Sequence, residues 1–95
     1  MKIRWTVPAL NAVEEIGDFI ARDNRAAAAR TVATIFQQTD LLAGHPAIGR
    51  AGRTPQTREL VISGTPYIVP YRVHNEEVQI LAVFHGARKW PEKFD

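Results

Sequence analysis

The chain has 95 residues, of which 45% are hydrophobic and 23% charged, and its formal net charge at pH 7 is +2. This length supports one domain with a single core, and the composition excludes a disordered chain. No stretch approaches the roughly 20 apolar residues of a membrane span, and the first residues lack a secretory pattern, so we expect a soluble cytoplasmic protein. Without cysteine the chain can form no disulfide, thiolate nucleophile or thiolate metal site.

The N-terminal residues predict a short strand and then a helix. Residues 2–6 alternate apolar and basic side chains, as an amphipathic strand does. Pro8 suits the first turn of a helix, and apolar positions then recur every three or four residues up to Ile20. We expect this helix to end near Arg22.

A second helix is predicted from Arg25 to a stop at Gly44. Asp23 and Asn24 are both suitable N-caps for it, and Ala26–Ala29 is a strongly helix-favouring run. Because the connection is so short, the two helices should fold back as an antiparallel hairpin. Their apolar stripes favour this packed hairpin over a solvent-exposed helical arm.

The second half of the chain predicts a loop and then three antiparallel strands. Residues 45–56 are rich in proline, glycine and arginine, which indicates a loop. The strands are expected over residues 58–62, 67–73 and 78–84. Pro70 cannot donate a ladder hydrogen bond, so we place it at a bulge. The last strand is apolar on both faces, which is typical of a strand covered on both sides.

The predicted element order is β-α-α-β-β-β, an α+β fold in a single domain over residues 1–95. An N-terminal strand precedes an antiparallel helical hairpin, which packs on one face of a C-terminal antiparallel sheet. The other face of the sheet would stay available for binding unless a further element covers it.

The positive excess lies in the second half of the chain and marks two basic regions. Arg50, Arg53 and Arg58 have no acid between them. A basic-aromatic tail follows the last strand and contains Arg88, Lys89, Trp90, Lys93 and Phe94. Such regions fit a nucleic acid or an acidic protein partner, and they also fit an ordinary solvated surface.

Few residue patterns in this chain indicate a catalytic centre. His45, His74 and His85 have no short spacing and no carboxylate beside them in the sequence, so we expect no metal site. The segment GRAGR lacks the lysine and the strand-to-helix context of a phosphate-binding loop, and we expect no cofactor. Ser63 is the only serine, and turn chemistry accounts for it.

Acid–base cleavage of RNA is the enzymatic alternative. It needs a proton acceptor, a proton donor and cations that stabilise the phosphorane charge. Arg53, Arg58 and Arg88 could supply the positive charge, and His85 could exchange the proton because imidazole titrates near neutral pH. At the end of an apolar strand, His85 could equally make a structural hydrogen bond.

Three segments carry a family resemblance. They are YIVPYRV at residues 67–73, ILAVFHGAR at residues 80–88 with its His-Gly-x-Arg ending, and the Gly49-Arg50 loop that precedes Arg58-Glu59-Leu60. Together with the element order, they resemble the ParE/RelE superfamily of type II toxin-antitoxin toxins over nearly the whole chain. The resemblance implies a small toxin neutralised by a cognate ParD-like antitoxin, whose extended or helical tail wraps the toxin's helices and sheet.

The resemblance also bears on the cellular target. RelE-like members cleave mRNA on the ribosome with basic residues on the central strands and a C-terminal tyrosine or histidine. Here Arg88 matches the arginine after the last strand, but Ile68 and Phe94 stand where the strand arginine and the terminal tyrosine fall. Isoleucine cannot hold a phosphate, and phenylalanine cannot transfer a proton. ParE-like members lack that catalytic set and inhibit DNA gyrase, trapping its cleaved complex with DNA.

The leading hypothesis is therefore a ParE-like gyrase inhibitor without catalytic residues. Its target-binding residues are expected to be Arg88, Lys89, Trp90, Lys93 and Phe94. One alternative is a RelE-like mRNA interferase that acts on the ribosome and its mRNA with Arg53, Arg58, His85 and Arg88. Another is a relative that only binds its antitoxin as a repressor component.

The apolar helices and the uncovered sheet surface indicate where an antitoxin would bind. The expected contact residues are Leu10, Val13, Ile35, Phe36, Arg58 and Arg72. Insertion of an amphipathic helix into a groove and addition of a strand at a sheet edge are both compatible with this surface. Either mode would give a toxin-antitoxin hetero-oligomer.

Overall fold

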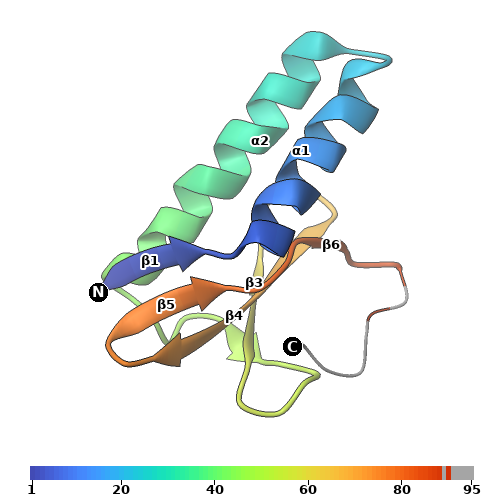
Figure 1. The fold of residues 1–95 in the computed structure, drawn as a ribbon. Coiled ribbons are helices and arrows are strands. Elements are labelled where there is room, and N and C mark those ends of the chain that lie inside the picture. The colour runs from blue at the N-terminus through green and yellow to red at the C-terminus, as the bar shows by residue number, and fades with distance from the viewer. Residues whose placement is uncertain (89, 91–95) are drawn as a thin grey trace.

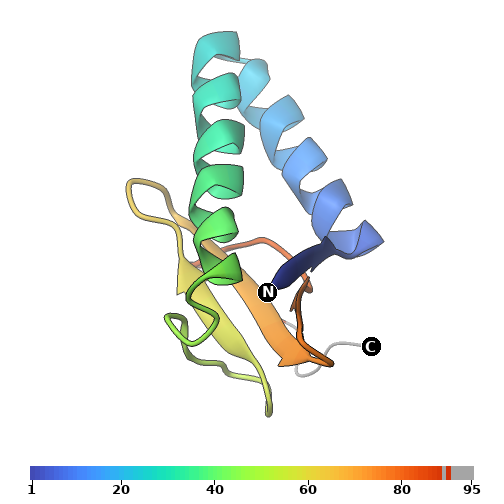
Figure 2. The same cartoon turned by 90° about the vertical axis from the view of Figure 1, so that its left-hand side faces the viewer.

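Two antiparallel helices rise from one face of a sheet in the computed structural model, which describes residues 1–88 and 90 (Figures 1 and 2). The helices are α1 (Val7–Ala21) and α2 (Arg25–Asp40), followed by a 3-10 turn, η1 (Leu41–Ala43). The strands are β1 (Lys2–Trp5), β2 (Arg50–Ala51), β3 (Arg58–Val61), β4 (Tyr67–His74), β5 (Glu77–Ile80) and β6 (Phe84–His85). The predicted α+β class, with a strand, a helical hairpin and then a largely antiparallel sheet, is confirmed.

Side-chain caps begin both helices. Thr6 Oγ1 accepts a hydrogen bond from the Ala9 amide at 3.3 Å, and Asn24 Oδ1 accepts one from the Ala27 amide at 2.9 Å. Asn24 is one of the two caps predicted for α2. The Thr6 hydroxyl also donates to the carbonyl of Ile80 at 2.7 Å, so the start of α1 is tied to the end of β5.

The helical hairpin packs on the sheet through its base, and its distal end projects beyond the sheet (Figure 2). Ala9, Val13 and Ile35 place the base of the hairpin in the main core. Along the hairpin the helices approach closely, because a Cβ added at Gly17 would lie 3.2 Å from Val32. Among residues 1–88 and 90, no helix has the length and apolar character needed to cross a bilayer.

The strands follow the order β1-β5-β4-β3-β2, and β6 pairs with the beginning of β4. β1 runs parallel to β5, and the other pairs are antiparallel. Side chains alternate along each strand, so one sheet face meets the helices and the other, which we call the far face, points away from them. The core residues on the helix-facing side include Leu60, Ile62, Val69, Tyr71, Val78 and Ile80.

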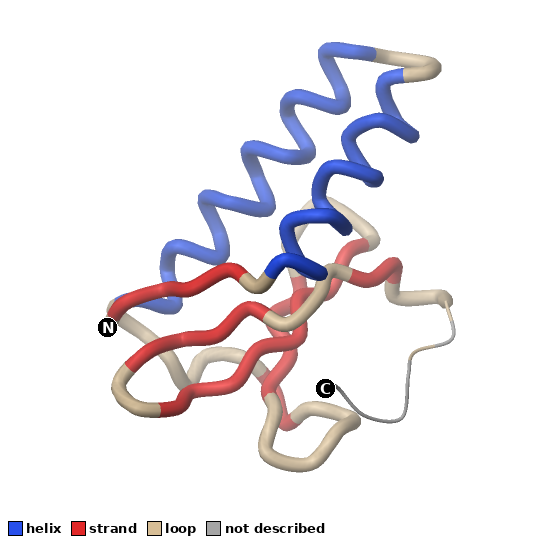
Figure 3. The backbone as a smooth tube through the Cα atoms, viewed as in Figure 1, coloured by secondary structure: helices blue, strands red, loops and turns tan. Residues whose placement is uncertain are grey.

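The last predicted strand is interrupted, which corrects the expectation of one strand over residues 78–84. β5 ends at Ile80 and β6 begins at Phe84, and Figure 3 shows loop between them. Residues 81–83 lie opposite only two residues of β4, Val69 and Pro70. The carbonyl of Pro70 accepts from the Leu81 amide at 3.0 Å. The backbone nitrogen of Pro70, which has no hydrogen to donate, therefore faces the same edge of β4, toward residues 81–83. The expected bulge at Pro70 is confirmed, and the missing donor explains why the ladder breaks there.

The loop predicted over residues 45–56 contains a short strand, so that prediction is wrong at β2. Arg50 and Ala51 pair with Glu59 and Arg58 of β3. Two residues between glycine-rich turns carry no detectable strand periodicity, and the pairing depends on a partner further along the chain.

Tyr71 holds this loop on the sheet. Its hydroxyl donates to the carbonyl of Pro46 at 2.8 Å and accepts from the amide of Gly49 at 2.8 Å. A Cβ at Gly49 would lie 2.5 Å from that hydroxyl, so only glycine permits the approach. Burial raises the pKa of Tyr71 above its ordinary value of 10.0, although the Gly49 hydrogen bond and nearby Arg58 oppose the shift.

Tyr71→Phe should destabilise the fold by about 1–3 kcal/mol, because it leaves a buried amide and a carbonyl without their partner. The tyrosine pKa is raised on folding, so the stability that this group contributes is present below the unfolded pKa and is lost as the pH rises through the folded one. Urea unfolding between about pH 8 and 11 should therefore show an alkaline loss in the wild type that is smaller in Tyr71→Phe. Tyr67→Phe is the matched control. If Tyr67→Phe and Tyr71→Phe reduced the alkaline loss of stability equally, the assignment to Tyr71 would be contradicted.

Candidate functional site

A groove of about 580 Å³ separates α1 from the part of the sheet formed by β4 and β6. Its apolar lining consists of Ala12, Ile16, Phe19, Tyr67, Val83 and Phe84. Its charged and polar lining consists of Glu15, Asp18, Arg22, His85 and Arg88. An apolar floor with charges of both signs suits an amphipathic peptide segment better than a uniformly charged ligand.

Phe19 is the most conspicuous apolar residue of this groove. Its side chain is 61% exposed although it lies on a helix with a buried face. The guanidinium of Arg22 lies 5.9 Å from the centre of the Phe19 ring. An exposed phenylalanine at the mouth of a groove marks an interaction surface more strongly than a scattered surface leucine does.

His85 lies on the opposite wall of the groove and makes local contacts. Its Nδ1 accepts a hydrogen bond from the Ala87 amide at 3.2 Å, and its ring meets the Tyr67 ring edge-on at 5.9 Å. The Arg88 amide donates to the His85 carbonyl at 3.0 Å, and the Gly86 amide donates to the Pro66 carbonyl at 2.8 Å. These bonds fix the turn after β6, which supports the structural alternative for His85.

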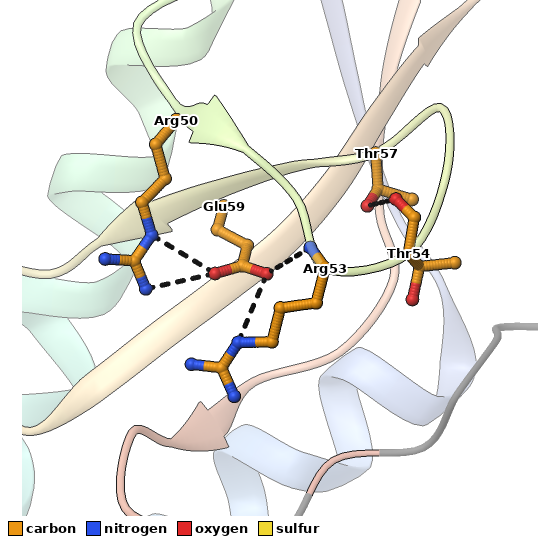
Figure 4. A network of polar contacts seen from close by, with 5 residues as sticks. All are labelled: Arg50, Arg53, Thr54, Thr57 and Glu59. Carbon is orange, nitrogen blue, oxygen red and sulfur yellow. Dashed lines mark hydrogen bonds and ion pairs between the residues drawn. The ribbon is translucent and has the colours of Figure 1, made fainter.

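On the far face, a buried carboxylate gathers two arginines (Figure 4). The side chain of Glu59 is 2% exposed. Its Oε1 accepts from Arg50 Nε at 3.2 Å and from Arg50 Nη2 at 3.0 Å. Its Oε2 accepts from the Arg53 amide at 2.8 Å and lies 3.6 Å from Arg53 Nε. Both oxygens of this carboxylate are thus engaged by cationic residues from the loop around β2.

Arg53 continues this contact chain to the C-terminal tail. Its guanidinium lies 3.8 Å from the centre of the Trp90 ring, and the Trp90 ring packs on Phe84 at 4.8 Å. We call the four residues Glu59, Arg53, Trp90 and Phe84 the far-face clasp. The tail thereby covers part of the sheet face that the sequence left open.

A second polar network crosses the far face between β1, β5 and β4. Glu77 Oε1 accepts from Arg4 Nε at 2.9 Å and from Gln79 Nε2 at 2.9 Å, and Gln79 Oε1 accepts from Arg72 Nε at 2.7 Å. The hydrogen bond from Gln79, and then that from Arg4, hold the pKa of Glu77 below its ordinary value.

The four residues of the ribonuclease alternative do not converge. His85 is opposite Tyr67 in the ladder and lines the groove with Arg88 on the helix-facing side. Arg53 is held on the far face by Glu59. Arg58 donates to the carbonyls of Ala47 at 3.2 Å and Gly49 at 2.9 Å, which occupies it with backbone. Among the described residues, no three His, Asp or Glu side chains cluster closely enough to hold a metal ion.

The structure separates the residues predicted to contact an antitoxin. Val13 and Ile35 are 4% and 0% exposed, so their prediction as contact residues is wrong, because their side chains fill the core. Leu10 is 45% exposed, and Phe36 packs on the ring of Trp5 at 4.8 Å. Arg58 and Arg72 keep exposed positions on the sheet while holding the contacts described above.

The predicted target-binding tail is divided in a similar way. Arg88 lines the groove, whereas Trp90 packs on the far face. Lys89, Lys93 and Phe94 lie outside the described residues. The structure therefore assigns a packing contact to Trp90, which the sequence indicated only as a contact for the target.

Sequence reasoning overlooked Glu59 and Phe19. Glu59 had a detectable signal, since an acid inside a short strand that follows three arginines with no acid between them is a candidate for a buried ion pair. Phe19 was assigned to the apolar stripe of its helix, and periodicity does not reveal that the sheet ends before it reaches this turn.

The comparisons with known proteins agree on one group. The family model for the ParE toxin of the type II toxin-antitoxin system parDE matches residues 3–90. Over 91 residues the chain is 50% identical to Y4kP of Sinorhizobium fredii, a protein classed by name as a toxin, covering 96% of this chain and 94% of the relative. Over 87 residues it is 34% identical to Toxin RelE2 of Caulobacter vibrioides, covering 92% of this chain and 97% of the relative.

A solved structure shows the same architecture. It belongs to the chromosomal ParDE TA system from P. aeruginosa, and it matches with a TM-score of 0.81 at 27% identity, over 90% of this chain and 95% of that chain. The fold thus defines a toxin of the ParE/RelE class. Within that class, the chain belongs to the ParE toxin family of type II toxin-antitoxin systems.

Carbon-detected NMR titration should find the carboxyl pKa of Glu77 below 4.5, and Gln79→Leu should raise it, because the largest stabilising hydrogen bond is removed. A depressed carboxyl pKa contributes stability that is present above the unfolded pKa and is lost as the pH falls through the folded one. An unchanged titration curve in Gln79→Leu would contradict the network as described.

Proposed function

We propose that this chain is a toxin that binds and inhibits DNA gyrase and that a cognate antitoxin neutralises it. The observation that carries the proposal is the dispersal of the ribonuclease candidates. RNA cleavage requires an acid, a base and cations around one phosphate, and Arg53 and His85 lie on opposite faces of the sheet. Family membership supports the toxin assignment, and binding rather than cleavage accounts for cationic residues that are spread over two surfaces.

An mRNA interferase is the second candidate. One relative at 34% identity carries a RelE name, and Tyr67, His85 and Arg88 line one groove. Against it, the positions of Ile68 and Phe94 carry no catalytic chemistry, and the Ala87 amide donates to His85 Nδ1, which leaves Nε2 as the ring nitrogen that could exchange a proton. This alternative depends on three groove residues instead of the four expected from the sequence.

Purified toxin should inhibit supercoiling by DNA gyrase, and Arg88→Ala should weaken inhibition by about tenfold if this exposed arginine contacts the target. The measurement is the toxin concentration that halves supercoiling of relaxed plasmid. Arg25→Ala, an exposed arginine at the distal end of the hairpin, is the matched control and should inhibit like the wild type.

Three results would contradict this assignment. Unaffected supercoiling at saturating toxin would exclude gyrase as the target. Primer extension on translated mRNA that showed cleavage by the wild type and its loss in Arg88→Ala would favour the interferase. If expression without the antitoxin caused no growth arrest, the chain would act only as an antitoxin-binding repressor component.

The groove between α1 and β6 is our proposed site for the antitoxin. Its apolar floor, with Phe19 exposed at one side, fits the apolar stripe of an amphipathic helix. The acids Glu15 and Asp18 and the basic Arg88 can then pair with charges that flank this stripe. The solved relative from P. aeruginosa is described as a ParDE system, which supports a partner of this kind.

Phe19→Asp should weaken binding of the antitoxin tail by at least about tenfold, because it places a charge in the apolar lining at the mouth of the groove. Leu41→Asp is the matched control, since Leu41 is similarly exposed at 54% and lies outside the groove. Isothermal titration with the tail peptide measures both. Equal weakening in the two variants would exclude the groove as the antitoxin site. So would a scrambled peptide that bound the wild type as tightly as the antitoxin tail does.

A further inference from the structure

We propose that Glu59 is a positioning residue that, through Arg53, fixes Trp90 on the far face. The inference rests on the proposed function, because its consequence is that target binding depends on a residue buried in the sheet. Within the fold, the far-face clasp is where the C-terminal segment meets the loop between β2 and β3.

The first step is the burial of the Glu59 carboxylate. A charged group with 2% exposure loses most of its hydration, so it persists only when hydrogen-bonded cations compensate it. Arg50 occupies one carboxylate oxygen, and the amide and side chain of Arg53 occupy the other. The carboxylate therefore fixes the backbone at residue 53 as well as the direction of its side chain.

The second step is the geometry of Arg53. A guanidinium is planar, so its edge can meet a carboxylate while its face stacks on an aromatic ring. Arg53 does both, with Nε 3.6 Å from Glu59 Oε2 and its central carbon 3.8 Å from the Trp90 ring centre. A lysine at this position would keep the charge but not the stacking plane.

The third step concerns what holds Trp90. Its indole Nε1 is buried and has no hydrogen-bond partner among residues 1–88, so no polar contact from that part of the chain positions the ring. The ring is held between Arg53 and Phe84, and Phe84 is fixed by its pairing with Ile68 of β4. Stacking on Arg53 is therefore the contact through which the loop can control the tail.

The proposal predicts different effects at the far-face clasp and at the groove. Arg88 lies at the groove, two residues before Trp90, and residues 91–95 follow directly. Loss of the Glu59 charge should release Trp90 and weaken target inhibition. Phe84 borders both the clasp and the groove, but its pairing with Ile68 of β4 holds it in place, so the groove should still bind the antitoxin. A merely structural ion pair would lower stability and affect both activities alike.

The experiment uses the full chain with Trp5→Phe, which leaves Trp90 as the only tryptophan, since the sequence has two. In this background Glu59→Gln and Arg53→Lys should increase acrylamide quenching of Trp90 fluorescence. The same variants should raise the toxin concentration for half-inhibition of gyrase by about tenfold while the affinity for the antitoxin tail stays within about twofold.

Glu77→Gln is the matched control, because Glu77 is also a far-face carboxylate paired with an arginine and does not contact the clasp. It should leave quenching and inhibition unchanged. If Glu59→Gln does not fold, Arg53→Lys tests the same contact by quenching and by gyrase inhibition, and Trp90→Leu tests it by gyrase inhibition, without removing the buried carboxylate.

Unchanged Trp90 quenching in Arg53→Lys would overturn the proposal, and so would a parallel loss of antitoxin and gyrase binding. The two proposals fail differently. If the wild type does not inhibit gyrase, the proposed target is wrong, and the quenching together with growth arrest on expression still decides whether Glu59 positions the tail.

Discussion

The missing N–H of Pro70 is the constraint on which the arrangement of the functional surfaces depends. It lies at the edge of β4 that the last part of the chain must follow, and the ladder breaks between Ile80 and Phe84. Three residues then span the length of two, which changes the phase of the chain along β4. As a result, β6 places His85 on the groove side, and Phe84 packs on Trp90 at the far face while it also borders the groove.

These two surfaces differ in how their charges are used. On the far face, Glu59 pairs with two arginines and Glu77 with one, and hydrogen bonds hold these cations in defined positions. In the groove, Glu15, Asp18 and Arg88 border an apolar floor with an exposed phenylalanine. The far-face hydrogen bonds hold charged side chains in place, whereas the groove presents an apolar area with few internal contacts for its charges.

The sequence was sufficient for the features that local chemistry determines. Three features depend only on neighbours within a few residues: the helix connection with its Asn24 cap, the alternation along the strands, and the break in the ladder at Pro70. β2 and the Glu59 pairing depend on contacts across the sheet, which local periodicity does not encode. Val13 and Ile35 show the same limit, because an apolar stripe gives the direction of burial but not whether the core or a partner covers it.

The arginines show why counting charge misleads about function in a small sheet protein. Arg50, Arg53 and Arg58 appear in the sequence as an unpaired basic group, yet two are engaged by a carboxylate that immediately follows the third, and the third by loop carbonyls. A strand places successive side chains on opposite faces, so Arg58 and Glu59, adjacent in the chain, serve different sides of the molecule. The register of the strands, and not proximity in sequence, decides which arginines are already paired with a carboxylate or a carbonyl. Among the described residues, Arg88 lies beyond the ladder and lines the groove, and it is also the arginine that the sequence resemblance matched.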